Sequence, residues 1–251
     1  LMFLGCPLRM ILRLGGGDLN ALFGIAGFAG GIGFGTIFLK RGYSLQRTYA
    51  LSKLESAMMP AIQVGLLVLV VTAPAFIFFS QKGPGAMHAP WLISLAAGLV
   101  VGGLSQVSRL CTVGGFRDLF LFKKSILIFG YLAVLIGVFV VNISFGNFHL
   151  GFENQPIAHT DGLWNFLGMA LAGFCSVLLG GCPLRQLIMT GEGNSDSAVT
   201  VLGLAAGAAF AHNFGLAATG AGPTLNGEIA VGVGFVVALI IAILNTKRAN
   251  A

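Results

Sequence analysis

The chain has 251 residues, of which only 9% are charged and 56% are hydrophobic, and its mean hydropathy is +0.92. Soluble domains carry roughly 25% charged residues, so this composition excludes an ordinary soluble protein and indicates an integral membrane protein. The formal net charge of +6 could suggest a nucleic-acid partner. Because the cations lie in alternate connections between apolar runs, we instead read the charge as a topology signal and expect no nucleic-acid role.

Seven apolar stretches recur along the chain, and each approaches the 20 or so residues that a helix needs to cross the hydrocarbon core. We expect spans at residues 18–39, 57–79, 91–108, 125–145, 162–179, 198–219 and 228–245. Glycines at four-residue spacing within them, such as Gly27, Gly31 and Gly35, would let helix backbones pack closely in lipid. The predicted class is an all-α integral membrane protein.

Positive charges favour one side of the membrane. They gather between spans one and two, between spans three and four, and after the last span, at Lys40, Arg41, Arg47, Lys53, Arg109, Arg117, Lys123, Lys124, Lys247 and Arg248. Lys82 is the only lysine or arginine in the connections 80–90, 147–161 and 220–227. The positive-inside rule therefore predicts a multi-pass protein of the cytoplasmic (inner) membrane, with residues 40–55, residues 109–124 and the C-terminus in the cytoplasm.

The pentapeptide Gly-Cys-Pro-Leu-Arg occurs twice, at residues 5–9 and 181–185, and each copy is followed after five residues by Gly-x-Gly. Under the alternating topology the spans after the two copies run in opposite directions, which is typical of an inverted-topology repeat. We predict that residues 90–247 form a complete second repeat. Residues 1–80 would form the C-terminal part of a first repeat, whose N-terminal part the chain lacks.

Each copy of the pentapeptide has the features of a helix start. In the second, Gly180 and Gly181 allow the preceding span to end, Pro183 suits the first helical position, and Cys182 becomes the cap residue. A short helix over 183–190 would end at Gly191, and one over 7–14, opened by Cys6 and Pro7, would end at Gly15.

Such a helix N-terminus attracts anions and activates a capping thiol, and Arg9 and Arg185 would add positive charge to it. The alternative interpretation is a buried cysteine in a tight turn. Because the whole motif is duplicated, we favour a role in transport.

A third cysteine, Cys111, also stands at a predicted helix break. Residues 108–122 are too short to cross the membrane and predict a re-entrant or interfacial helix. Arg109 and Arg117 either support this site or anchor the chain at the cytoplasmic surface, and Asp118 could compensate Arg117 locally. For Cys175 we favour packing.

The histidines are weaker candidates for a site. His212, inside a predicted span, either lines a cavity or is a hydrogen-bonded core residue. His88, His149 and His159 fall in outer connections and suggest loop structure, with substrate capture as the alternative.

The sequence offers no sign of a metal, a cofactor or an energy-coupling site. None of the four cysteines belongs to a CxxC pair, and no histidine cluster has zinc-ligand spacing. We see no ATP-binding motif, so movement of a substrate would be passive or coupled to an ion. We expect no cofactor and no enzymatic activity.

Taken together, these motifs resemble the YeeE/YedE family of membrane proteins, and within it the YedE-type proteins assigned to selenium transport. The resemblance rests on the two pentapeptides and on residues 109–118 (RLCTVGGFRD), 83–90 (GPGAMHAP), 159–166 (HTDGLWNF) and 222–227 (GPTLNG). It implies an hourglass-shaped, inverted-repeat transporter with short broken helices and central cysteines. In thiosulfate-importing relatives such thiols pass the anion along by hydrogen bonds to its sulfur, which implies substrate-binding roles for Cys6, Cys111 and Cys182.

Our hypothesis is therefore a permease for a small, anionic sulfur- or selenium-containing species, with the bilayer and that substrate as its partners. Two alternatives stay open. One is a membrane thiol oxidoreductase or sulfur-transfer enzyme, and the other is a membrane subunit that works with a soluble sulfur-carrier protein.

Overall fold

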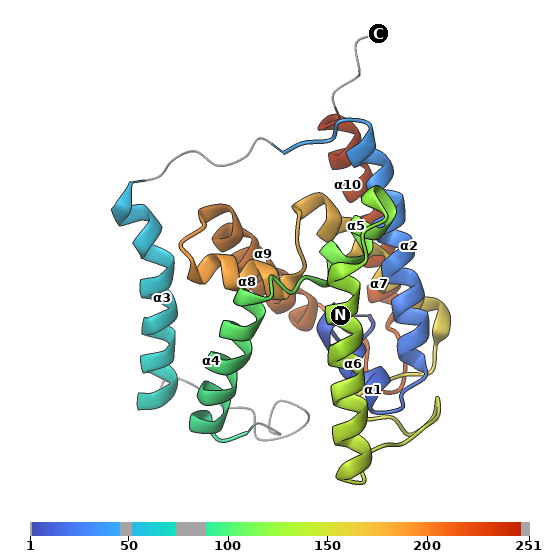
Figure 1. Ribbon diagram of the computed structural model, residues 1–251. Helices are drawn as coiled ribbons and strands as arrows, with labels where there is room; N and C mark the ends of the chain where they lie inside the picture. Colours follow the sequence, from blue (N-terminus) through green and yellow to red (C-terminus); the bar gives the residue numbers. More distant parts are fainter. Residues whose placement is uncertain (1, 46–51, 74–88, 247–251) are drawn as a thin grey trace. The chain divides into compact units, whose positions relative to one another are not determined.

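The computed structural model describes residues 2–45, 52–73 and 89–246, and within these ranges every regular element is a helix (Figure 1). The predicted all-α class is confirmed. The helices are α1 (Pro7–Gly15), α2 (Asn20–Lys40), α3 (Lys53–Thr72), α4 (Trp91–Val107), α5 (Thr112–Phe122), α6 (Ile126–Ser144), α7 (Gly162–Leu179), α8 (Pro183–Gly191), α9 (Ser195–Asn213) and α10 (Leu225–Leu244). Predictions that concern Arg47, Lys82, His88, Lys247, Arg248 and most of the segment 83–90 lie outside the described residues.

Within the described part of the chain, five segments are long and apolar enough to cross a membrane: α2, α4 continued by α5, α6, α7 continued by α8, and α10. A multi-pass membrane protein is therefore supported. All seven predicted spans contain a helix, but two of these helices fall outside that set. The apolar part of α3 is short, at Pro60–Thr72, and the predicted residues 74–79 lie outside the described chain.

Helix α9 ends earlier than the predicted span 198–219. Its last residue is Asn213, because Gly215 adopts the left-handed conformation (φ 64°) and the Leu216 N–H turns back to the Ala211 carbonyl at 2.8 Å. This is a glycine-terminated helix end. The predicted alternation of inside and outside loops requires all seven segments to cross, so it stays a prediction.

The chain divides into two compact units. The first contains α1, α2, α5, α6, α7 and α10, the second contains α3 and α4, and the boundary between them falls within α8 and α9. This division reflects packing. The predicted repeats are defined by similarity between two parts of the chain, and a division by packing does not test such similarity. The inverted repeat therefore also stays a prediction.

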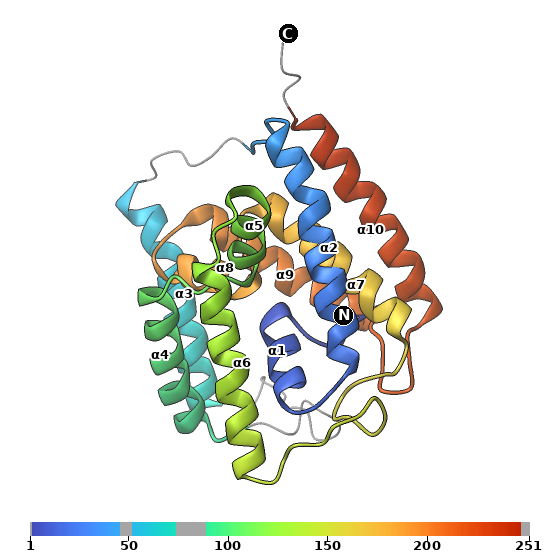
Figure 2. The same cartoon turned by 45° about the vertical axis from the view of Figure 1, so that its right-hand side comes forward.

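Helices α2 and α7 form the tightest pair of the first unit and lie side by side (Figure 2). A Cβ atom at Gly27 or Gly31 would overlap the carbonyl oxygen of Phe166 or Ala170 on α7. A Cβ at Gly35 would overlap the side chain of Val177. The four-residue glycine spacing of α2 therefore does what the sequence predicts, since it lets two backbones touch.

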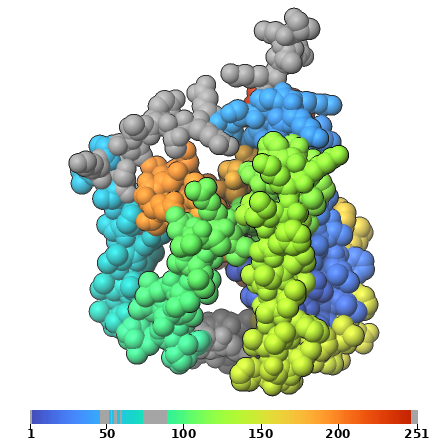
Figure 3. Space-filling view, in the orientation of Figure 1, coloured from blue at the N-terminus to red at the C-terminus, as the bar shows by residue number. Residues whose placement is uncertain are grey.

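Helix α6 packs on α1 and α5 along one side, and its other side is uncovered in Figure 3. The uncovered side is apolar and includes Ile126, Phe129, Ile136 and Phe145, each at least 62% exposed. Such a surface suits contact with lipid. The one buried residue of α6 is Tyr131, which packs in a cluster with residues of α1 and α5.

Candidate functional site

Each of the three predicted cysteines stands directly before a short or broken helix. Cys6 is the N-cap of α1, in an extended conformation (φ −88°, ψ 172°), and Pro7 is the first helical residue. Cys182 immediately precedes α8, which begins at Pro183. The predicted helices 7–14 and 183–190 are both present and extend one residue further, to Gly15 and Gly191.

The break before Cys182 is made by glycine, as the sequence predicts. Gly180 ends α7 in the left-handed conformation (φ 86°), and the Gly181 N–H returns to the Ser176 carbonyl at 3.1 Å. Glycine enters this conformation without a steric penalty, so the chain can stop one helix and start another within three residues. Cys182 is thereby carried into the interior, where it is 1% exposed.

Cys111 caps α5 through its sulfur. The Gly114 N–H donates a hydrogen bond to Cys111 Sγ at 3.3 Å, so the thiol occupies the place that a serine oxygen takes in an ordinary cap. The first turn of α5, from Thr112 to Gly115, is buried. Gly114 and Gly115 face Leu127 and Ile128 at the start of α6. The predicted short helix after Cys111 is therefore present, with its N-terminus directed at a thiol.

The structure brings Cys111 and Cys182 together. The Cys111 thiol lies within hydrogen-bonding reach of both the side chain and the backbone of Cys182. Cys111 is half-buried and packs against the hydrophobic cluster to which Cys182 belongs. Two thiols from distant parts of the sequence thus meet at the starts of two helices.

Tyr131 of α6 belongs to the neighbourhood of these cysteines. Its hydroxyl is close enough to both cysteines to interact electrostatically with them, and its side chain belongs to the same cluster as Cys182. Cys6 itself is exposed. Tyr131 was not among the residues predicted from the sequence. The available signal was a phenol hydroxyl in the middle of a mostly apolar run.

Cys175 lies elsewhere in the first unit. It packs with Phe38, Tyr43 and Phe174 and lines an apolar cavity of about 330 Å³. Burial is the main cause that raises the pKa of the Tyr43 hydroxyl, and the neighbouring Cys175 is the second cause. This phenol therefore stays neutral. The surroundings of Cys175 are those of a packed residue. His212 is exposed near the end of α9 and is not among the residues that line this cavity.

The four predicted arginines have different surroundings. Arg117 pairs with Asp118 at 2.9 Å, as the sequence analysis predicts. Arg185 Nη1 donates to Gln106 Oε1 of α4, also at 2.9 Å. The side chain of Arg9 folds back over Gly5, and Arg109 adopts a left-handed conformation (φ 52°) at the end of α4. Their roles in transport stay predictions.

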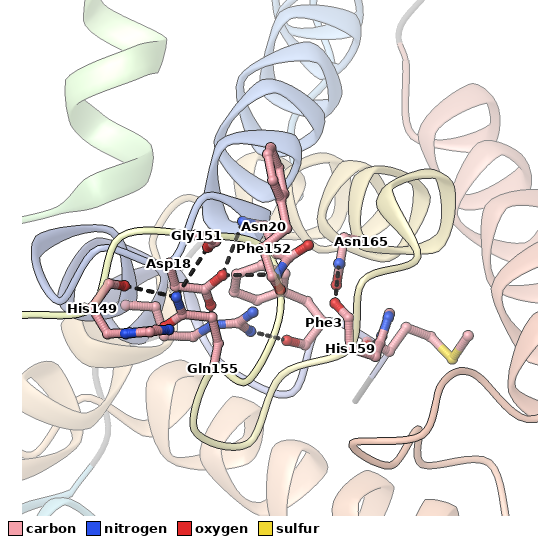
Figure 4. A network of polar contacts seen from close by, with 11 residues as sticks. Phe3, Asp18, Asn20, His149, Gly151, Phe152, Gln155, His159 and Asn165 are labelled. Atoms are coloured by element: carbon pink, nitrogen blue, oxygen red, sulfur yellow. Dashed lines mark hydrogen bonds and ion pairs between the residues drawn. The ribbon is translucent and has the colours of Figure 1, made fainter.

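A buried polar network ties down the segment that precedes Cys6 (Figure 4). Arg13 Nε and Asp18 Oδ2 form an ion pair at 2.6 Å, and their side chains are 6% and 3% exposed. Arg13 Nη1 donates to the Phe3 carbonyl, and the guanidinium lies 4.2 Å above the centre of the Phe3 ring. Asp18 Oδ1 accepts hydrogen bonds from the backbone and side chain of Asn20 at 2.9 and 3.0 Å.

The loop before α7 joins the same region. Asn20 Nδ2 donates to the Phe152 carbonyl at 2.7 Å, and His159 Nε2 hydrogen-bonds the Met2 carbonyl at 2.7 Å. The Asn165 side chain donates to the His159 carbonyl at 3.1 Å. His159 is buried within this loop, in agreement with the loop-structure interpretation. The Arg13–Asp18 pair was not predicted from the sequence, although two opposite charges on either side of three glycines were a usable signal.

Within the described ranges, no three histidine, cysteine or acidic side chains are arranged to hold a metal ion. The site is thus built of thiols, one phenol hydroxyl and the N–H groups of helix starts. Thiols are weak donors and soft acceptors, and helix starts carry partial positive charge. Such an arrangement can bind a soft anion weakly.

A family model described as "Sulphur transport" matches residues 107–247, which is more than half of the chain. The matched region contains Cys111, Tyr131 and Cys182. The comparisons with curated proteins and with solved structures gave no match. At the level of the family, the resemblance to YeeE/YedE proteins is confirmed, and the chain belongs to the sulphur transport family.

Proposed function

We propose that this protein is a permease that passes a small anionic sulfur- or selenium-containing species along Cys6, Cys111 and Cys182. The family supports membrane transport of a sulfur species. The observation that carries the relay is the contact between Cys111 and Cys182, because a substrate leaving one thiol would find the other within hydrogen-bonding reach. Tyr131 belongs to the same buried cluster as Cys182, and we infer that it meets the substrate on the way between Cys182 and Cys6.

The chemistry of these groups suits transient binding of a substrate better than tight binding. A pore must bind its substrate strongly enough to admit it and weakly enough to release it. An S–H donor makes a weak hydrogen bond to a terminal sulfur or selenium atom, and neutral thiols avoid the cost of a buried charge. The N-termini of α1, α5 and α8 add partial positive potential where the anion would pass. Since sulfur and selenium are similar acceptors, both substrate classes fit.

We also infer that the protein resides in the inner membrane with residues 40–55, residues 109–124 and the C-terminus in the cytoplasm. The distribution of lysine and arginine supports this orientation. A soluble sulfur carrier on the cytoplasmic side would be a compatible receiver for the substrate.

The test is uptake by proteoliposomes that contain the purified protein, with labelled thiosulfate and with sulfite, selenite and selenide as competitors. We expect Cys182→Ala and Cys111→Ala each to reduce the initial rate of uptake at least about tenfold. In each variant the substrate loses one hydrogen bond, which contributes about 1.4 kcal/mol or more. Cys175→Ala is the matched control, because it removes a packed thiol outside the cluster, and it should retain the wild-type rate.

Membrane insertion of each variant is checked by reconstitution yield and gel filtration. Wild-type uptake in Cys182→Ala would contradict the relay, whereas equal loss in Cys175→Ala would indicate a general folding defect.

The contact between Cys111 and Cys182 also favours a second candidate, a sulfur-transfer enzyme, because it supplies a nearby resolving thiol. A Cys182 thiolate would attack the outer sulfur of thiosulfate, form a persulfide and release sulfite. Cys111 would then attack the persulfide, form a disulfide and release hydrosulfide. Mass spectrometry separates the two functions. A permease delivers intact thiosulfate to the lumen and leaves both cysteines unmodified, whereas the enzyme accumulates sulfite and a persulfide or disulfide.

A further inference from the structure

Helix α6 has one buried side chain, and it is a polar one. Of the nineteen residues of α6, all of which the structure describes, Tyr131 alone is buried, at 7% exposure. Apart from Asn142 and Ser144 near its C-terminal end, the other residues of the helix are apolar, and all of them are partly or fully exposed. Helix α6 packs against both α1 and α5 (Figure 2). Tyr131 belongs to a buried cluster with Met10 and Ile11 of α1 and Val113 of α5. The fold thus directs a phenol into the interior of the first unit.

The Tyr131 hydroxyl has no hydrogen-bond partner among the described residues. Its ring packs edge-on against Phe116, with centroids 5.8 Å apart and planes at 75°, so the apolar part of the side chain is well accommodated. A buried hydroxyl without a partner costs free energy, and a phenylalanine would fill the same space without that cost. Packing therefore accounts for the ring but not for the oxygen.

The unpartnered hydroxyl lies where the proposed path runs. Tyr131 belongs to the same buried cluster as Cys182, and its hydroxyl is within electrostatic range of Cys6. A second buried hydroxyl without a partner in the described chain, that of Thr112, directly follows Cys111. Thiols match the sulfur or selenium end of a substrate, whereas a hydroxyl is a stronger donor that matches oxygen. Both kinds of group stand side by side here.

We propose that the Tyr131 hydroxyl donates a hydrogen bond to an oxygen atom of the transported anion as it passes between Cys6 and Cys182. This inference rests on the proposed permease function and deepens it. The site then recognises two ends of one substrate: a terminal sulfur or selenium at the thiols and an oxyanion at the phenol. An anion without oxygen, such as hydrosulfide, engages only the thiols.

The experiment compares Tyr131→Phe with Tyr43→Phe in proteoliposomes. Tyr43 is a matched control because its hydroxyl is likewise buried and without a partner in the described residues, but it lies beside Cys175. We expect Tyr131→Phe to raise the KM for thiosulfate about tenfold, the effect of losing one hydrogen bond to a charged acceptor. The inhibition constant of hydrosulfide against the same uptake should change less than about twofold. Tyr43→Phe should match the wild type, and neither variant should lose thermal stability.

A second readout does not depend on transport. Cys6 is exposed, so its alkylation by N-ethylmaleimide in detergent can be followed by mass spectrometry. Thiosulfate should slow this alkylation in the wild type and in Tyr43→Phe, and about tenfold more thiosulfate should be needed in Tyr131→Phe. Absence of uptake in the wild type, with this protection intact, would reject the permease function and leave the contact with Tyr131 standing.

Two results would overturn the inference about Tyr131. Equal thiosulfate KM and equal protection in Tyr131→Phe and wild type would mean that an ordered water satisfies the hydroxyl. Equal weakening of thiosulfate and hydrosulfide would mean that Tyr131 only shapes the path and makes no contact with oxygen.

Discussion

The buried pair Arg13–Asp18 gives the sharpest test of how the fold holds Cys6 in place. Asp18→Asn keeps the size of the side chain and removes its charge. Arg13 then remains buried beneath the Phe3 ring, with its guanidinium opposite a neutral amide. Breaking a buried pair by removing one partner costs about 3–5 kcal/mol, because a buried charge is left uncompensated.

The loss of stability in Asp18→Asn can be compared with that at a second arginine–aspartate pair in the same chain. Arg117 and Asp118 are in contact at 2.9 Å, but their side chains are 30% and 24% exposed. Exposed pairs contribute about 0–1 kcal/mol. For a chain of this size a loss of 1 kcal/mol lowers Tm by roughly 2–4 °C. Asp18→Asn should therefore lower Tm by at least about 6 °C, and Asp118→Asn by less than about 4 °C.

The assay is thermal unfolding of the purified protein in detergent, together with the alkylation rate of Cys6. Since Arg13 also holds the Phe3 carbonyl, loss of the pair should free the segment before α1 and speed alkylation of Cys6 in Asp18→Asn. Alkylation in Asp118→Asn should equal that of the wild type. Equal Tm values for the two variants would refute the argument that burial makes the first pair the stronger determinant.

Two further predictions concern the contact between thiols and the orientation of the chain. Diamide takes two electrons and two protons from a pair of thiols, so it should form a disulfide between Cys111 and Cys182. This disulfide should stop thiosulfate uptake until dithiothreitol reduces it. A disulfide from either cysteine to Cys175 instead would contradict the observed packing. In intact cells a membrane-impermeant maleimide should label Glu153→Cys and leave Lys124→Cys at the level of the unsubstituted protein, and the reverse pattern would invert the proposed topology.

The local features of the site could be predicted from sequence because local rules determine them. Pro183 after Cys182 starts a helix and Gly180 ends one, both through backbone preferences of single residues. The new helix ends at Gly191, and Gly193 adopts the left-handed conformation (φ 85°) two residues later. The close approach of α2 and α7 likewise follows from small residues at a fixed spacing, as at Gly31.

The features that depend on tertiary contact could not be predicted. Nothing in the sequence around Cys111 names Cys182 as its neighbour, and Tyr131 is distinguished only by where α6 packs. Apolar patterning cannot place such contacts in a membrane protein, because lipid-facing and buried surfaces are both hydrophobic. For the same reason the early end of α9 was missed, since Gly215 looks like many other glycines in these spans.

The distribution of positive charge around the thiols bears on how a permease of this kind could work. Arg117 is paired with Asp118, which compensates its charge. Arg185 keeps its full charge, because its partner Gln106 of α4 is neutral. In a medium of low polarity a full positive charge would hold an anion strongly and slow its release. The starts of α1, α5 and α8 each offer only about half a charge, and one N–H of α5 is already bound to Cys111. Under the proposed relay, weak dipoles, weak thiol donors and a single phenol would admit an anion without trapping it, provided that the Arg185 guanidinium stays hydrogen-bonded to Gln106.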